Sequence, residues 1–192
     1  MKTWGVYLAK ALSFLGHPLL LGTLYVILMS YRNLPEGQAL TLTICVMGIV
    51  TLPILVHNWK KTRKGQYTNF DVSDQQQRKG FYLIALGLVL TLLLTLWSFG
   101  LPGEVLNHTL IFLGMIILMA LLNRQLKASM HAALAIYVAV NLFGLGKSAG
   151  VLFLAFAVGV AWSRWKLGRH SPTEIAIGSV FGLVFGLIAV GV

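Results

Sequence analysis

Long apolar runs dominate this chain, and they restrict its fold more than any other feature. Seven runs approach or reach the length of roughly 20 residues that an α-helix needs to cross a bilayer. Short polar or turn-forming segments such as Leu34-Pro35-Glu36-Gly37 separate them. The predicted spans are Ala9–Tyr31, Gln38–Trp59, Gly80–Phe99, Val105–Leu122, His131–Gly146, Val151–Trp165 and Glu174–Val192.

The composition agrees with a membrane location. The chain is 57% apolar and only 10% charged, whereas soluble domains have about 25% charged residues. We therefore predict an all-α, polytopic transmembrane helix bundle with six to seven spanning helices. No low-complexity linker or internal repeat divides the sequence, so residues 1–192 are expected to form a single domain.

The distribution of basic residues predicts how the chain is oriented. Its 15 Lys and Arg residues against 5 acidic ones give a net charge of +10. Because these residues cluster at the ends of the apolar runs, a nucleic-acid partner is not expected. If the spans alternate in direction, thirteen basic residues lie on one face, and only Arg32 and Lys147 lie on the other. This bias predicts a multi-pass protein of the cell inner membrane with the basic face in the cytoplasm.

The same face collects the residues that are capable of chemistry. They come from the segments 60–79, 123–130 and 164–173, and ionisable groups at the edge of an apolar bundle are functional candidates. Arginine binds phosphate through paired, charge-assisted hydrogen bonds, and a helix beginning near Ser171 would add backbone N–H groups. No set of carboxylate, His and Cys residues has the spacing of metal ligands, so neither a metal nor another cofactor is expected. The candidates are Arg78, Lys127, Ser129, His131, Arg164, Arg169, His170 and Glu174.

Three short stretches between Asp71 and Glu174 resemble the motifs of the type 2 phosphatidic acid phosphatase family. Ser163-Arg164, five residues, His170, three residues and Glu174 is similar to the family's third motif, which ends in Asp. Ala128-Ser129-Met130-His131 keeps the Ser and His of the second motif, Pro-Ser-Gly-His. Arg78 fits the Arg of the first motif, but Asp71 stands at its Lys and Lys79 at its Pro.

The resemblance implies a metal-independent lipid phosphate or diphosphate phosphatase, a hydrolase of bacterial lipid metabolism. Its substrate would belong to the phosphatidic acid, phosphatidylglycerophosphate or polyprenyl diphosphate class. His170 would attack phosphorus and form a phosphohistidine, and Glu174 would activate it. His131 would protonate the leaving lipid alcohol and then activate water. The residues that would hold the phosphate oxygens are Arg164, Ser129, Arg78 and Lys127.

Several alternatives stay open at the level of sequence. Ser171-Pro172-Thr173-Glu174 is also the pattern of a helix start, so Glu174 is a capping residue, the orienting partner of His170, or both. Asp71 in the first motif leaves room for an altered substrate or for lost catalysis. The alternative function is a non-catalytic membrane protein that binds or carries a phosphorylated lipid. Many members of the resembled family act on the outer membrane face, which conflicts with the orientation that the charges predict.

Two further expectations concern residues outside the motifs. Gly178, Gly182 and Gly186 form a ridge of small residues at four-residue spacing, which predicts close packing of the last helix inside the bundle. His17, His57 and His108 belong to no motif and are expected to be structural. The sequence does not reveal an oligomeric state.

Overall fold

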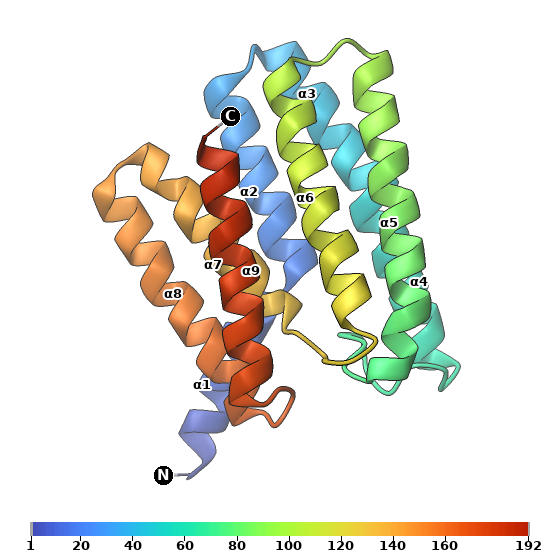
Figure 1. The fold of residues 1–192 in the computed structure, drawn as a ribbon, viewed down its shortest axis with the longest axis vertical. Coiled ribbons are helices and arrows are strands. Elements are labelled where there is room, and N and C mark those ends of the chain that lie inside the picture. The colour runs from blue at the N-terminus through green and yellow to red at the C-terminus, as the bar shows by residue number, and fades with distance from the viewer. Residues whose placement is uncertain (1, 192) are drawn as a thin grey trace. The chain divides into compact units, whose positions relative to one another are not determined.

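A computed structural model describes the backbone of residues 2–191 and the side chains of residues 4–191. Over this range the chain is helical and has no strand, which confirms the predicted all-α class (Figure 1). Val192, the last residue of the final predicted span, lies outside the described residues. The elements are α1 (Lys2–Leu15), α2 (Pro18–Asn33), α3 (Glu36–Cys45), the π-helical turn η1 (Val46–Thr51), α4 (Leu52–Arg63), α5 (Gln75–Ser98), α6 (Gly103–Leu122), α7 (Met130–Leu142), the 3-10 turn η2 (Phe143–Leu145), α8 (Lys147–Lys166) and α9 (Pro172–Val190).

The lengths of the apolar helices identify a multi-pass membrane protein. In the described part of the chain, 5 helices are long and apolar enough to cross a membrane. They are Glu36–Arg63, which joins α3, η1 and α4, together with α5, α6, α8 and α9. A sixth crossing exists if α1 and α2 act as one span.

The first predicted span, Ala9–Tyr31, is interrupted in the structure. Its two helices, α1 and α2, are bent by 50° at Gly16 and His17. Pro18 opens α2 at a position where its missing N–H group is tolerated, but it could not continue a helix from α1. Hydropathy detects the apolar run but not the break within it.

The fifth predicted span, His131–Gly146, is also shorter than a crossing. Its helical part, Met130–Leu145, falls in the class of apolar helices of 10–17 residues. At about 1.5 Å per residue such a helix does not reach across a hydrocarbon core of about 30 Å. Most residues of α7 are buried, so this helix is a core element. The seven predicted spans therefore reduce to five or six.

The chain divides into two compact units. The first unit contains the residues up to Gly22 and those from Leu126 onward. In it α7 packs against both α8 and α9, and α1 packs against α8. A Cβ atom placed on Gly182 would lie 2.1 Å from the backbone oxygen of Ala133, so α9 approaches the α7 backbone as the glycine ridge predicts. The prediction of a single domain over residues 1–192 stays a prediction.

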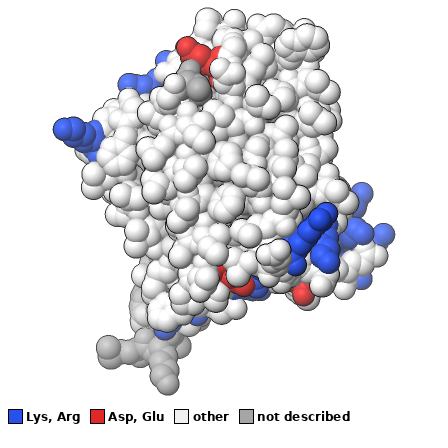
Figure 2. All heavy atoms as spheres, viewed as in Figure 1, with Lys and Arg blue, Asp and Glu red and all other residues white. Residues whose placement is uncertain are grey.

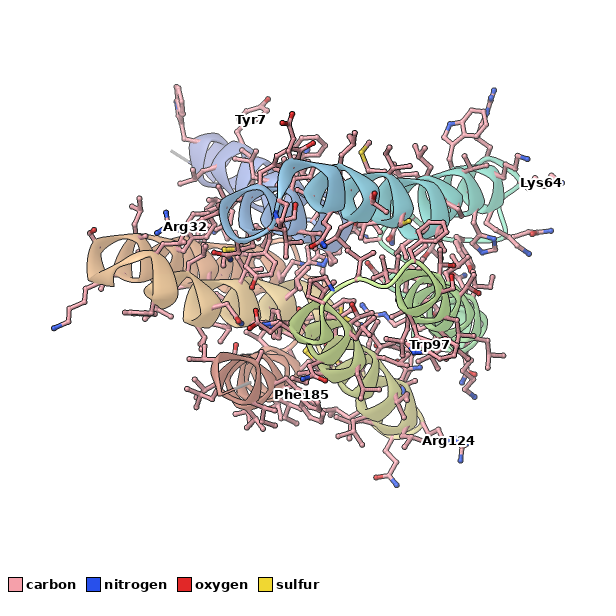
Figure 3. The ribbon with its side chains drawn as sticks, turned by 90° about the horizontal axis from the view of Figure 1, so that it is seen from above. Tyr7, Arg32, Lys64, Trp97, Arg124 and Phe185 are labelled. Carbon is pink, nitrogen blue, oxygen red and sulfur yellow. The ribbon has the colours of Figure 1, made fainter. Side chains whose placement is uncertain are left out.

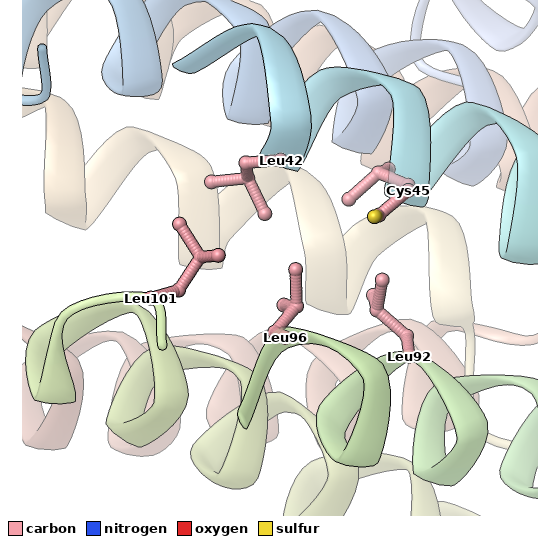
Figure 4. Close-up of a cluster of buried hydrophobic side chains, with 6 residues drawn as sticks. Leu42, Cys45, Leu92, Leu96 and Leu101 are labelled. Atoms are coloured by element: carbon pink, nitrogen blue, oxygen red, sulfur yellow. The ribbon is translucent and has the colours of Figure 1, made fainter. Parts of the chain in front are cut away.

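The second unit contains residues 23–125 and is built around α3, η1, α5 and α6. Its α3 and α5 face each other through a cluster of buried side chains (Figure 4). In a bilayer the hydrophobic effect does not favour helix association, because lipid tails are as apolar as the side chains. Close van der Waals packing of such side chains stabilises the helix pair instead. The cluster consists of Leu42, Cys45, Val46, Leu92, Leu96 and Leu101.

The basic residues of the second unit gather where α4 ends, α5 begins and α6 ends. Gln75 Nε2 donates to the backbone oxygen of Asn123 at 2.8 Å, and Asn123 Nδ2 donates to that of Gln75 at 3.0 Å, which joins two of these ends. Lys64 and Arg124 extend outward from the ribbon (Figure 3). Figure 2 shows broad areas without charged side chains, as expected for lipid-facing helices.

Candidate active site

The third predicted motif begins at the end of α8, continues through the loop that follows and ends in the first turn of α9. The backbone oxygen of Arg164 accepts hydrogen bonds from the N–H groups of Arg169 at 2.9 Å and His170 at 3.3 Å. Gly168 permits this reversal because its φ angle is +65°, a conformation that L side chains rarely adopt. Arg164 is only 1% exposed and His170 only 4%. The loop thus keeps a guanidinium and an imidazole buried at the same end of α8.

Glu174 contacts His170 as the motif spacing predicts. The distance between His170 Nδ1 and Glu174 Oε2 is 2.8 Å. Because a carboxylate can only accept, Nδ1 donates its proton, and the lone pair of the neutral ring belongs to Nε2. This arrangement is the one that a nucleophilic or basic imidazole needs.

The same glutamate also closes the capping box of α9. Glu174 N–H donates to Ser171 Oγ at 3.2 Å, and Ser171 N–H donates to Glu174 Oε2 at 3.2 Å. The two alternatives for Glu174, helix cap or partner of His170, are therefore both present in the structure. The helix start fixes the carboxylate, and the carboxylate fixes the imidazole.

The second predicted motif is hydrogen-bonded to the third. Ser129 caps α7, since its Oγ accepts from the N–H group of Ala132 at 3.4 Å. Its own N–H group donates to the backbone oxygen of Glu174 at 3.0 Å. Lys127 Nζ lies 3.9 Å from Glu174 Oε2, and His131 is buried in the first turn of α7. Residues far apart in sequence therefore meet at the starts of α7 and α9.

Helix α1 and the break that follows it contribute two residues that sequence reasoning did not select. Ser13 Oγ accepts a hydrogen bond from Arg164 Nη1, and both side chains are buried. The ring of His17, which the sequence left as structural, lies edge-on to that of His131, with 5.3 Å between centroids and 86° between planes. One signal was available, because Ser13 and His17 are polar residues four positions apart in an apolar run.

Arg78 is the one predicted site residue that does not belong to the first unit. It is buried in the second unit, where its Nε donates to the backbone oxygen of Val72 at 2.8 Å. The remaining predicted site residues, Lys127, Ser129, His131, Arg164, Arg169, His170 and Glu174, all lie in the first unit.

His57, another histidine expected to be structural, contacts a tyrosine of the same unit. Its Nε2 lies 3.0 Å from the hydroxyl oxygen of Tyr67. Burial raises the pKa of the Tyr67 phenol. This pair ties the end of α4 to the loop that follows it, which is a structural role.

Comparison with known proteins adds no relative. No family model matches the chain, and neither a curated protein nor a solved structure matches it. The chemistry of the site therefore rests on its own groups. They are a buried arginine, a histidine oriented by a carboxylate, a second buried histidine, a capping serine and a nearby lysine. Buried cations act on an anion more strongly than exposed ones because the surroundings screen them less.

Proposed function

We propose that the chain is an integral-membrane phosphatase that removes a phosphate group from a lipid phosphate or lipid diphosphate through a phosphohistidine intermediate. The observation that carries this proposal is the contact of 2.8 Å between His170 Nδ1 and Glu174 Oε2, at the end of α8 where Arg164 is buried. A nucleophile held by a positioned base or carboxylate is the common signature of covalent catalysis.

In the first step, the lone pair of His170 Nε2 forms a bond to phosphorus while the ester bond between phosphorus and the lipid oxygen breaks. Glu174 accepts the Nδ1 proton in a hydrogen bond and stabilises the positive charge that the ring gains. His131 gives its proton to the departing lipid oxygen, which leaves as an alcohol. The products of this step are phosphorylated His170 and the free lipid alcohol. With a lipid diphosphate the bond that breaks is the phosphoanhydride bond, and the leaving group is the lipid monophosphate.

In the second step, His131 takes a proton from water, and the water oxygen attacks phosphorus. The bond between phosphorus and His170 Nε2 breaks, inorganic phosphate leaves, and both histidines return to their first state. Arg164 and Lys127 are the cations of the first unit that would offset the charge on the phosphate oxygens. The Ser129 hydroxyl would donate to one of these oxygens.

The surroundings favour a lipid rather than a water-soluble phosphate ester. Helices α8 and α9, which both border the site, are apolar and long enough to cross a membrane. A lipid could present its headgroup at the helix ends while its chains stay in the bilayer. We place the protein in a bacterial inner membrane with this site on the cytoplasmic face, because basic residues are enriched at the ends of helices that face the cytoplasm.

Purified protein tests the proposal most directly. It would be incubated in mixed micelles with phosphatidic acid, phosphatidylglycerophosphate or a polyprenyl diphosphate while released phosphate is measured. We expect release from at least one lipid, and a fall of more than about a thousandfold in His170→Ala, as for other essential nucleophiles. His108→Ala, in a helix of the second unit, is the matched control and should keep the wild-type rate.

Two results would contradict the proposal. One is a His170→Ala variant that is properly folded and as active as the control. The other is wild-type protein that binds these lipids but releases no phosphate, which would favour the non-catalytic lipid carrier.

A further inference from the structure

We propose that α1 and the break that follows it supply two positioning residues, Ser13 for the phosphate-binding Arg164 and His17 for the proton-transferring His131. This inference rests on the proposed function, since both residues would act through members of that site. It adds the N-terminal helix to a site whose recognised motifs begin far later in the chain. It also gives a role to a histidine that matches none of those motifs.

The contact of Ser13 with Arg164 is held by close packing of two helices. Helices α1 and α8 pack antiparallel, since Gly5 lies beside Lys166 whereas Gly16, just after α1, lies beside Val160. At Gly16 an added Cβ would lie only 2.4 Å from a methyl carbon of Val160, so the helices approach closely near the break.

Ser13 belongs to this closely packed stretch and is 8% exposed, and Arg164 is 1% exposed. The hydroxyl of Ser13 therefore accepts from Nη1 within the protein interior. An arginine that must bind an oxyanion gains most when its planar group is oriented in advance.

The contacts of His17 fix its ring from two sides. His17 directly precedes α2, its backbone oxygen accepts from the N–H group of Leu21 at 2.9 Å, and its Nδ1 accepts from the N–H group of Leu19 at 3.2 Å. These bonds are those of a helix N-cap, and they place the ring proton on Nε2. The ring then contacts His131 edge to face, at 5.3 Å between centroids.

A capping role alone does not explain the choice of histidine. Asn, Asp, Ser and Thr are the residues preferred at a helix N-cap, and each is smaller than histidine. What histidine adds is a flat ring that reaches His131 and limits its rotation. A proton carrier must keep its donor atom within hydrogen-bond reach of the reacting oxygen, and a displacement of about 1 Å can lower the rate about a hundredfold.

Three substitutions of His17 separate the cap from the ring. His17→Asn keeps a cap but removes the ring, His17→Phe keeps a ring but removes the cap, and His17→Ala removes both. We expect His17→Asn to keep the wild-type unfolding temperature and KM but to lower kcat by about tenfold to a hundredfold. His17→Phe should unfold at a lower temperature but keep a higher kcat than His17→Asn. The control is His108→Asn, which makes the same exchange in the second unit.

Ser13 is tested by its effect on substrate binding. Ser13→Ala should lower kcat/KM for the lipid phosphate by about tenfold, since it removes one hydrogen bond to a charged group, and Ser13→Thr should restore most of the loss. Ser30→Ala is the control, because Ser30 is a buried serine whose Oγ donates only to its own helix, at Ile27 O.

The outcomes distinguish this inference from the proposed function. Wild-type protein that releases no phosphate defeats the proposed function and the inference with it. Active wild-type protein with an unchanged kcat in His17→Asn defeats the inference alone. The inference is equally overturned if the activities of the His17 variants fall only in parallel with their unfolding temperatures, because that pattern belongs to a structural cap.

Discussion

At the scale of single residues, one oxygen of Glu174 organises the start of α9. Its Oε2 lies 2.8 Å from His170 Nδ1, 3.2 Å from Ser171 N and 3.9 Å from Lys127 Nζ. A carboxylate in the first turn of a helix is also favoured by the helix dipole. The Glu174 carboxylate can therefore both cap α9 and orient His170. A substitution is needed that removes one of these roles and keeps the other.

Glu174→Gln should make that separation. Glutamine also serves in a capping box, so the helix start and the unfolding temperature should change little. The neutral amide no longer stabilises a positive ring on His170, and we expect kcat to fall by at least about a hundredfold. The measurements are phosphate release and thermal unfolding on the same preparations.

Ser171→Ala is the complementary control for Glu174. It removes the hydroxyl that accepts from Glu174 N–H and should lower stability by about 1 kcal/mol, with most of the activity retained. If Glu174→Gln instead unfolds early and keeps its activity, the carboxylate serves the helix alone.

The contact of His170 with Glu174 was predictable from the sequence, whereas the contact of Ser13 with Arg164 was not. His170 and Glu174 are four positions apart across the start of α9, and the spacing of the third motif predicts their contact. Ser13 and Arg164 are 151 positions apart, and their contact depends on how α1 packs against α8. Ser13 stands out as a polar residue in an apolar run, but nothing in the sequence around it identifies Arg164 as its partner.

At the scale of helices, the glycine ridge of α9 sets how closely that helix approaches α7. An added Cβ at Gly178 would lie 2.4 Å from Ser129 O, and one at Gly182 would lie 2.1 Å from Ala133 O. Both obstacles are backbone atoms, which cannot rotate away as a flexible side chain can. Because Ser129 and His131 stand at the start of α7, the ridge also positions part of the site.

Gly182→Ala should therefore separate α9 from α7. We expect a loss of about 1–3 kcal/mol in the free energy of unfolding, the usual range for overpacking, and reduced phosphate release. Gly87→Ala in α5 is the matched control, since its Cβ would meet no atom within 4 Å. That variant should be as stable as the wild type or slightly more stable, because alanine favours a helix. Equal stability of the two variants, measured by thermal unfolding in detergent, would contradict this account of the ridge.

Helix positions were predictable from hydropathy, but helix continuity was not. The apolar runs lead to the correct class, and five of the predicted spans fall on the helix Glu36–Arg63 and on α5, α6, α8 and α9. The break at Gly16 and His17 depends instead on the local start of α2. The short α7 depends on burial against the rest of the protein. Hydropathy reports only that a residue avoids water, and a protein core and a lipid satisfy that condition equally.

At the scale of the whole molecule, the charge bias holds within each unit taken separately. In the second unit the ends of α4 and α6 and the start of α5 carry most of the basic residues, and Arg32 stands alone at the end of α2. In the first unit the end of α8 and the loop to α9 carry Arg164, Lys166 and Arg169, and Lys147 stands at the opposite end of α8. Each unit, taken by itself, therefore carries the same bias of basic residues toward one end of its helices.

Labelling of single cysteines in intact cells tests this orientation. The native Cys45 is only 7% exposed and would be replaced by alanine. Gln66→Cys then marks the basic loop between α4 and α5, and Asn33→Cys marks the end of α2, both at exposed positions. If basic ends face the cytoplasm, a membrane-impermeant maleimide should label Asn33→Cys in intact cells and Gln66→Cys only after lysis. The reverse pattern would place the basic loop on the outer face, where many members of the resembled family act, and would show that these cations are kept for a reason other than topology.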